Sequence, residues 1–408
     1  MRSGKNYRLT DFPLVAVGLP KAMPAILNND NKLTGSSPRP GKFFLFLNSM
    51  TKKRIALLCL VLLTAAIKIF SLFPDAVERY YSTGLYPVIS RGQRFLFGWL
   101  PFSIGDIFYA LVVIYFIYKL VDLIKRIRKK RADKNYWKGG LKRLVIIVLL
   151  VYSSFNLFWG LNYNRRGIAH QLELTTGKIN KEDLIAVMQQ LLLKVNKFDS
   201  VGKLDRAIIS NKKYLISGAI RSYESLAKNN IDFDYKTPSI KPSLFSYLGN
   251  YLGYTGYYNP FSGEAHVNTT VPLFIQPYTT CHEIGHQLGY AKENEANFAG
   301  YLSAKNSTDP NFLYSVYFEL YSYGRPYLYY QDSLSLKKLD SSLQPGIKRD
   351  FKELKEFYLS HENPAEKVID KLYSQYLKAN EQPSGRVTYS EVIIWMVAYY
   401  RKYGKDAL

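Results

Sequence analysis

The stretch from Thr279 to Asn297 reads Thr-Thr-Cys-His-Glu-Ile-Gly-His-Gln-Leu-Gly-Tyr-Ala-Lys-Glu-Asn-Glu-Ala-Asn and contains an H-E-x-x-H motif. Residues four apart lie on one face of a helix, so His282 and His286 can each direct a ring nitrogen at a single metal ion. Glu283 lies alongside and can reach a water held by that ion. The motif therefore predicts a zinc hydrolase.

A catalytic zinc site needs a third protein ligand, and two carboxylates follow the motif closely. Gly289 stands where a glycine commonly ends a helix, and Glu293 and Glu295 come just after it. Both glutamates are candidates for the third ligand. The alternative to a metal site is a helix whose two histidines only pack.

The composition is strongly basic, with a formal net charge of +23. Basic residues are densest from Lys125 to Arg143, where the only acid is Asp133, and this block lies between two apolar runs. A cytoplasmic loop between membrane spans, attracted to anionic lipid, explains such a block better than nucleic-acid binding does. We therefore expect the lipid bilayer as a partner and no nucleic acid.

Three apolar runs predict three transmembrane helices within residues 50–161. They cover Ile55–Phe73, Ile104–Ile124 and Leu144–Leu161, each close to the length that crosses the hydrocarbon core. Residues 1–49 are polar and without periodicity, so we expect them to be disordered or an upstream extension of the reading frame.

The distribution of basic residues also predicts the orientation of these spans. Lys52, Lys53 and Arg54 precede the first span, and the basic block separates the second from the third. The positive-inside rule places both in the cytoplasm. An odd number of spans then puts residues 162–408 on the outer side of the membrane. The sequence makes no prediction of oligomeric state.

Residues 162–408 alternate helical patterns with a short Tyr-, Gly- and Pro-rich region, which predicts a mainly helical α+β domain with a small β-sheet. A helix is predicted over Glu293–Ala304 and a strand over Gly263–Thr269. On that strand we expect His266 to lie at the surface rather than to be a fourth ligand. Further tyrosines are candidate oxyanion donors, namely Tyr314, Tyr317, Tyr321 and Tyr323.

The motif resembles that of the gluzincin metallopeptidases, which carry H-E-x-x-H on one helix and a glutamate ligand on the next, often as E-x-x-x-D. Here Glu293 takes the place of that ligand and Asn297 the place of the Asp, which favours Glu293 and leaves Glu295 as the alternative. The third histidine of the metzincins is replaced by Lys292. In such peptidases a strand placed like Gly263–Thr269 forms a sheet edge for an extended peptide.

Over about residues 50–405 the layout resembles an uncharacterised family of bacterial membrane proteins with three spans and an outward-facing domain. The shared segments are Tyr258–Ala265, His282–Gly289 and Glu295–Phe298. This resemblance implies a zincin-like domain outside the bacterial cytoplasmic (inner) membrane and a zinc-dependent protease.

The predicted function is a membrane-anchored zinc metallopeptidase that hydrolyses peptide bonds of polypeptides in the cell envelope. One Zn²⁺ ion on His282, His286 and Glu293 would lower the pKa of a bound water toward about 7, and Glu283 would accept its proton as general base. The alternatives are a non-catalytic, zinc-stabilised membrane scaffold and a zinc hydrolase that acts on a non-peptide amide.

Overall fold

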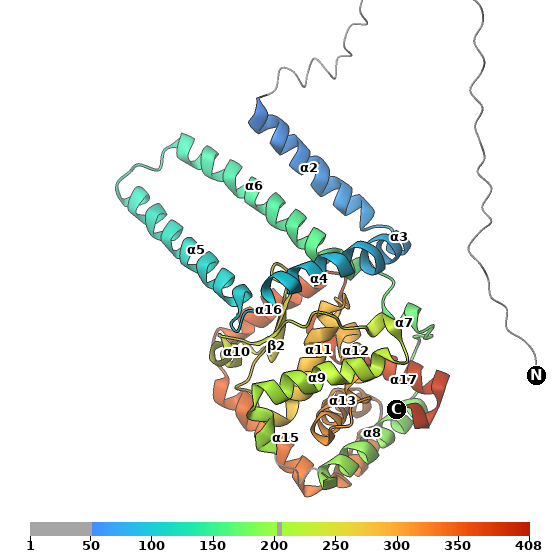
Figure 1. Ribbon diagram of the computed structural model, residues 1–408. Helices are drawn as coiled ribbons and strands as arrows, with labels where there is room; N and C mark the ends of the chain where they lie inside the picture. The colour runs from blue at the N-terminus through green and yellow to red at the C-terminus, as the bar shows by residue number, and fades with distance from the viewer. Residues whose placement is uncertain (1–50, 202–205) are drawn as a thin grey trace, which may run out of the picture. The chain divides into compact units, whose positions relative to one another are not determined.

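The computed structural model describes residues 51–201 and 206–408. The predicted disordered extension, residues 1–49, lies outside the described residues. The chain divides into two units, Met1–Ile55 and Ala56–Leu408. The second unit holds the membrane-length helices α5 and α6, a small sheet and the H-E-x-x-H helix, and the described chain is mostly helical (Figure 1).

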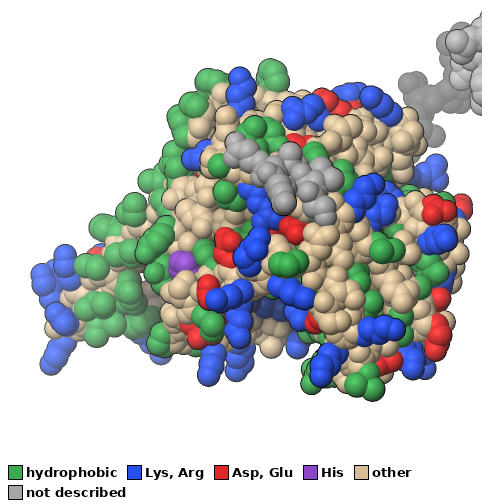
Figure 2. All heavy atoms as spheres, turned by 90° about the horizontal axis from the view of Figure 1, so that it is seen from below, with side chains coloured by type: hydrophobic (Ala, Val, Ile, Leu, Met, Phe, Trp, Pro, Cys, Tyr) green, Lys and Arg blue, Asp and Glu red, His purple; other side chains and the backbone are tan. Residues whose placement is uncertain are grey.

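Among the described residues, two helices are long and apolar enough to cross a membrane, α5 (Ile104–Arg128) and α6 (Lys134–Phe158). A third span arises only if α2 (Lys52–Phe70) is counted with the helical segment Pro74–Phe97, from which it is bent by 100°. Most large apolar side chains of α5 are exposed, as expected for a helix that contacts lipid. Hydrophobic side chains gather along the projection at the left of Figure 2, while charged ones of both signs mix over the rest of that face.

The connection between the first two apolar runs is helical rather than extended. It consists of α3 (Pro74–Ala76), the π-helix η1 (Val77–Leu85) and α4 (Tyr86–Phe97). Ser90, Gln93 and Arg94 of α4 are buried, whereas Val88, Phe95 and Leu96 are exposed. An inverted pattern of this kind fits a helix that lies between a polar domain and a bilayer surface.

The sheet has three short strands in the order β1-β3-β2. Strand β1 (Ile240–Pro242) runs parallel to β3 (Glu264–Val267), and β2 (Gly256–Asn259) pairs with β3 antiparallel, with Tyr257 opposite His266. The expectation that the strand before the metal helix forms a sheet edge is wrong, because β3 is the central strand. Strand β2 forms the edge on the side of the H-E-x-x-H helix.

The remaining described helices build the domain around a central pair, α11 and α12, whose residues are all buried. The prediction of a helix over Glu293–Ala304 is confirmed, since these are the bounds of α12. The α-helices are α7 (Ile168–Gln171), α8 (Lys181–Val201), α9 (Lys212–Ala227), α10 (Ser246–Leu252), α11 (Gln276–Gln287), α12, α13 (Pro310–Gln331), α14 (Ser333–Ser341), α15 (Pro345–His361), α16 (Glu366–Ala379) and α17 (Val392–Tyr403). Short helices are η2 (Gly160–Asn164), η3 (Arg206–Ser210), η4 (Ile231–Phe233), η5 (Leu273–Ile275), η6 (Gly385–Tyr389) and η7 (Lys405–Ala407).

Two apolar clusters hold these elements together. The larger joins α8, α9, α11, α12, α13 and α17. The smaller joins Ile67 of α2, Val77 and Tyr81 of η1, Trp159 after α6 and Tyr258 of β2. Because this second cluster combines side chains from the membrane-side helices with a strand of the sheet, it fixes the domain against the ends of those helices.

Candidate metal centre

The H-E-x-x-H motif lies on α11, which packs directly against α12. A Cβ on Gly300 of α12 would come 3.0 Å from the backbone nitrogen of His282, so only glycine lets the two helices approach this closely. After α11 the chain turns at Gly289, whose φ of 91° is in the left-handed region. This turn and close packing bring the first residue of α12, Glu293, against the two histidines.

Three groups that could hold a metal ion meet there. One ligand atom from each of His282, His286 and Glu293 lies within 4.8 Å of the others, and all three residues are buried. The Oε2 atom of Glu293 lies 3.3 Å from Nε2 of His282 and 3.4 Å from Nε2 of His286. The two imidazole rings are nearly perpendicular, at 88°. This places two imidazole nitrogens and a carboxylate oxygen around one point.

The other ring nitrogen of each histidine has an oxygen partner. Nδ1 of His282 lies 2.7 Å from Oδ1 of Asn297, and Nδ1 of His286 lies 2.8 Å from the Tyr290 carbonyl. The Asn297 amide nitrogen donates to the Tyr389 carbonyl, which fixes the side of Asn297 that faces His282. Since these oxygens can only accept, Nδ1 of both histidines carries a proton, and Nε2 is the nitrogen that faces the centre.

Glu283 lies beside the ligand group but is not part of it. Its side chain is buried, and its Oε2 atom has no hydrogen-bond partner. A Cβ on Gly256 of β2 would come 2.5 Å from its Oε1 atom, so strand β2 passes directly over this carboxylate. The carboxylate therefore stands between the histidines and the edge strand.

Burial and mutual charge perturb the pKa values of this group. Burial raises the pKa of Glu283 to about 8 and lowers that of His282. Burial also disfavours the charged form of His286, but the Glu293 carboxylate outweighs this and raises the pKa of His286 to about 9. Burial opposes ionisation of Glu293 as well, yet the two histidines hold its pKa well below the ordinary value.

Glu295, the second predicted candidate ligand, is placed away from the three grouped residues. Its carboxylate lies against Gly167, where a Cβ would come 2.0 Å from Oε1. Burial raises its pKa, while the charges of Lys292 and Arg165 act in the opposite direction. The structure thus groups His282 and His286 with Glu293 and leaves Glu295 on the opposite side of α12.

A cavity of about 320 Å³ opens on the metal group. Most residues that line this cavity were not predicted from the sequence, including Tyr373 and Tyr376 of α16 and Tyr389 of η6. The Tyr373 hydroxyl donates to Oε1 of Glu293 at 3.0 Å and lies 2.9 Å from the Tyr389 hydroxyl. The sequence signal for these lining residues is the spacing of Tyr373 and Tyr376, three residues apart on one face of a helix. Helices that only pack against a core have the same spacing, so the signal does not identify a cavity.

The tyrosines predicted as oxyanion donors lie elsewhere. All four are on α13, outside this cavity. Tyr314 donates its hydroxyl to Asp350, and Tyr321 donates to Asp340 at 2.9 Å. Helix α13 packs into the larger core, so these residues support the domain rather than face the metal group.

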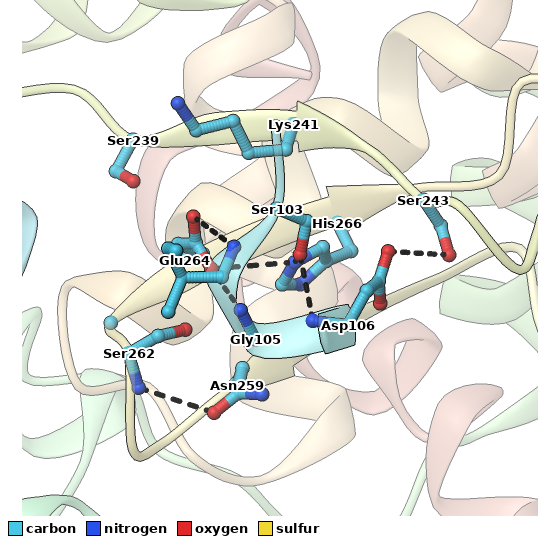
Figure 3. Close-up of polar contacts among 12 residues, drawn as sticks. Ser103, Gly105, Asp106, Ser239, Lys241, Ser243, Asn259, Ser262, Glu264 and His266 are labelled. Carbon is cyan, nitrogen blue, oxygen red and sulfur yellow. Dashed lines mark hydrogen bonds and ion pairs between the residues drawn. The ribbon is translucent and has the colours of Figure 1, made fainter. Parts of the chain in front are cut away.

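A second buried polar cluster joins the first turn of α5 to β3 (Figure 3). Glu264 accepts hydrogen bonds from the backbone nitrogens of Ile104, at 3.3 Å, and Gly105, at 2.6 Å. Nε2 of His266 lies 2.5 Å from the Ser103 hydroxyl. The expectation that His266 lies at the surface is wrong: it is fully buried, because the first turn of the membrane helix covers this strand.

Asp106 extends this cluster to the edge strand. It accepts from the Leu244 backbone nitrogen at 2.6 Å and from the Tyr257 hydroxyl. The Tyr257 ring stacks on His266, with centroids 4.4 Å apart. The first turn of α5 therefore holds strand β2 in place over Glu283.

The carboxyl end of α11 is capped by side chains from the membrane side. Helix termini leave their last carbonyls without partners inside the helix. Here the Gln287 carbonyl accepts from Tyr86 at 2.9 Å, from Ser90 at 3.0 Å and from Arg94 at 3.1 Å. The His286 carbonyl accepts from Nε1 of Trp159 at 3.1 Å. The positive charge of Arg94 also complements the negative end of the helix dipole.

Comparison with known proteins places the chain in a family. No curated protein and no solved structure matches it. A family model with the description "Protein of unknown function (DUF3810)" matches residues 81–397, which is more than half of the chain and includes both helices of the metal group. The chain therefore belongs to the family described as Protein of unknown function (DUF3810).

Proposed function

We propose that this protein is a membrane-anchored zinc metallopeptidase that hydrolyses peptide bonds of envelope polypeptides. One observation carries the proposal: two imidazole nitrogens and a carboxylate oxygen lie within 4.8 Å of one another in a buried site, beside a further carboxylate that is not a member of the group. Three protein ligands and a separate glutamate are the usual parts of a catalytic zinc site.

The donor set suits zinc in chemistry as well as in number. Imidazole nitrogen and carboxylate oxygen are zinc ligands, and both Nδ1 protons are engaged with oxygens outside the centre. The Oε2 atom of Glu293 is buried without a hydrogen-bond donor. A cation at the point between these atoms satisfies the two lone pairs and the carboxylate together.

Zinc held there supplies a Lewis acid that polarises a carbonyl and makes water acidic. In the proposed reaction the Glu283 carboxylate accepts a proton from the attacking water and delivers it to the leaving amine. Strand β2, at the sheet edge, offers backbone groups along which an extended peptide can add as a further strand. The tyrosine hydroxyls of the cavity are available to stabilise the developing oxyanion.

We also propose that the protein has three membrane spans and that the domain with the metal group faces the outer side of the membrane. The ends of α5 and α6 next to the domain are Ile104 and Phe158, so the basic block of residues 125–143 lies at their opposite ends. The positive-inside rule then supports a cytoplasmic position for that block and an extracytoplasmic one for the metal group. We infer the cytoplasmic membrane of a bacterium as the location.

The test uses the full chain purified in detergent and compares it with Glu283→Gln. Zinc content is measured by mass spectrometry, and hydrolysis is measured on a peptide library. We expect zinc in both proteins and a loss of about 10²- to 10⁴-fold in hydrolysis for Glu283→Gln. Equal hydrolysis by the two proteins would rule out Glu283 as the base.

The same measurement separates the alternatives. A protein that binds zinc and cleaves neither peptides nor other amides is a zinc-stabilised scaffold. Cleavage confined to a non-peptide amide, with the same sensitivity to Glu283→Gln, identifies a hydrolase of another substrate class.

A further inference from the structure

The cavity at the metal group is walled partly by the membrane helices themselves. Tyr109 of α5, Phe155 of α6 and Trp159 just after α6 line it, across from His282 and Glu283. The turn between β2 and β3 completes this aromatic wall. Its Phe261 lies 5.8 Å from the Phe108 ring and 6.5 Å from the Phe158 ring, measured between centroids.

These wall residues are held rigidly in the domain. Tyr109 follows directly on the first turn of α5, which Glu264, His266 and Tyr257 fix through the contacts of the second polar cluster. At the end of α6, the Trp159 indole donates to the backbone carbonyl of His286, and its ring lies 5.8 Å from the His286 imidazole. The membrane helices are therefore structural parts of the cavity and not flexible tethers.

Exposed apolar side chains of α5 begin beside this wall. Ile107 and Phe108, the neighbours of Tyr109, are 38% and 43% exposed, and apolar side chains remain exposed from there along the rest of α5. Phe95, Leu96 and Trp99 are likewise exposed at and after the end of α4. Exposed aromatic and aliphatic side chains in this position are typical of a membrane interface.

We propose, resting on the function proposed above, that the substrates are polypeptides anchored in the same membrane and that they are cleaved within a few residues of the bilayer surface. A segment that emerges from the bilayer beside α5 and α6 meets the aromatic wall at once and continues along strand β2 to Glu283. A polypeptide free in solution must reach a cavity whose membrane side is occupied by lipid.

The test uses the full chain in vesicles of phosphatidylethanolamine and phosphatidylglycerol. Pools with a randomised ten-residue segment are supplied free in solution, or joined to an apolar transmembrane segment through a spacer of two or of 25 residues. A flexible spacer of about 25 residues carries the cleavable segment roughly 25–30 Å from the membrane. We expect the two-residue pool to be cleaved at least about tenfold faster than either other pool.

The outcomes distinguish this inference from the proposed function. Cleavage of the free or long-spacer pool at a rate equal to or above that of the short-spacer pool overturns the inference and leaves a metallopeptidase. No cleavage of any pool above that of Glu283→Gln removes the proposed function, and this inference with it.

A second readout does not depend on turnover. A photo-crosslinking phenylalanine replaces Tyr109 in the Glu283→Gln protein, with the same replacement at Tyr118 as the matched control on α5, where the side chain is 63% exposed. We expect position 109 to capture the short-spacer peptide and position 118 to capture lipid. Equal capture of peptide at both positions, or capture at neither, overturns the inference.

Discussion

Two buried clusters of histidine and carboxylate in the described part of the chain differ in what their polar atoms contact. In the metal group, His282 and His286 turn Nε2 toward Glu293, and the Oε2 atoms of Glu283 and Glu293 lack a hydrogen-bond donor. In the polar cluster of Figure 3, Glu264 accepts from two backbone nitrogens and Nε2 of His266 is occupied by Ser103.

Comparison of the two clusters indicates which property separates a metal-binding site from a structural contact. Residue types and burial are alike in the two clusters, so neither distinguishes them. What distinguishes them is whether the ligand atoms converge on a shared point or are bonded to neighbours, as both Glu264 oxygens and Nε2 of His266 are, although Nδ1 of His266 has no partner. The convergent cluster is the candidate metal centre, and the polar cluster joins a membrane helix to the sheet.

The strongest predicted change is the loss of bound zinc when a histidine of the metal group is replaced, in contrast to a histidine of the polar cluster. His282→Ala should reduce bound zinc from about one equivalent per chain to almost none, because a site with three protein ligands loses one imidazole. His266→Gln, the control, should keep its zinc, since His266 contacts Ser103 and not the metal group. Zinc analysis of the purified proteins checks both, and full occupancy in His282→Ala contradicts the ligand assignment.

A pair of substitutions on α12 tests the assignment of the third metal ligand. Glu293→Gln should weaken zinc binding strongly, whereas Glu295→Gln should leave it unchanged, because only Glu293 faces the histidines. Zinc retained after dialysis against a chelator of known affinity measures the difference. The reverse result would assign Glu295 as the ligand.

A smaller effect is expected at Asn297, which fixes the His282 ring through Nδ1. Asn297→Ala should lower zinc affinity about 10- to 100-fold, the usual range for a group that orients a ligand. Asn294→Ala on the same helix is the matched control, because Asn294 bonds Glu391 instead. Equal affinity in both variants argues against this positioning role.

The smallest effect is a pH dependence of stability that arises from His266 in the polar cluster. Burial, with the Lys241 charge adding to it, lowers the pKa of His266 to about 3. The Glu264 carboxylate, whose oxygen is 3.8 Å from Nε2 of His266, favours the charged imidazole, but burial outweighs it.

The direction of this pH effect follows from the number of protons that the folded and unfolded states bind. Between pH 3 and 6.5 the unfolded chain binds a proton at His266 that the folded protein does not, so folding stability falls on acidification. At pH 5 the loss is about 2 kcal/mol relative to pH 7. Thermal melts at both pH values should show a smaller acid-induced drop for His266→Gln than for the wild type. An equal drop in both contradicts the prediction.

The sequence predicted what is encoded locally. The H-E-x-x-H motif and the segment that follows it located α11 and α12, and long apolar runs located α5 and α6. The burial of His266 was not predictable in this way, because it depends on Ser103, which lies 163 residues earlier in the chain. The helix α4 was not predicted because Ser90, Gln93 and Arg94 are buried while its apolar Val88 and Phe95 are exposed, which inverts the usual pattern.

The capping of α11 by Tyr86, Ser90, Arg94 and Trp159 has a practical consequence for anyone who isolates the outer part of the protein. A truncated protein that starts at Asn162 keeps all three grouped ligand residues but lacks all four of these donors. The carbonyls of the last turn, which begins beside His286, then depend on water, and a helix end in that condition frays. Loss of metal from such a truncated protein would report the missing caps and not a wrong ligand set.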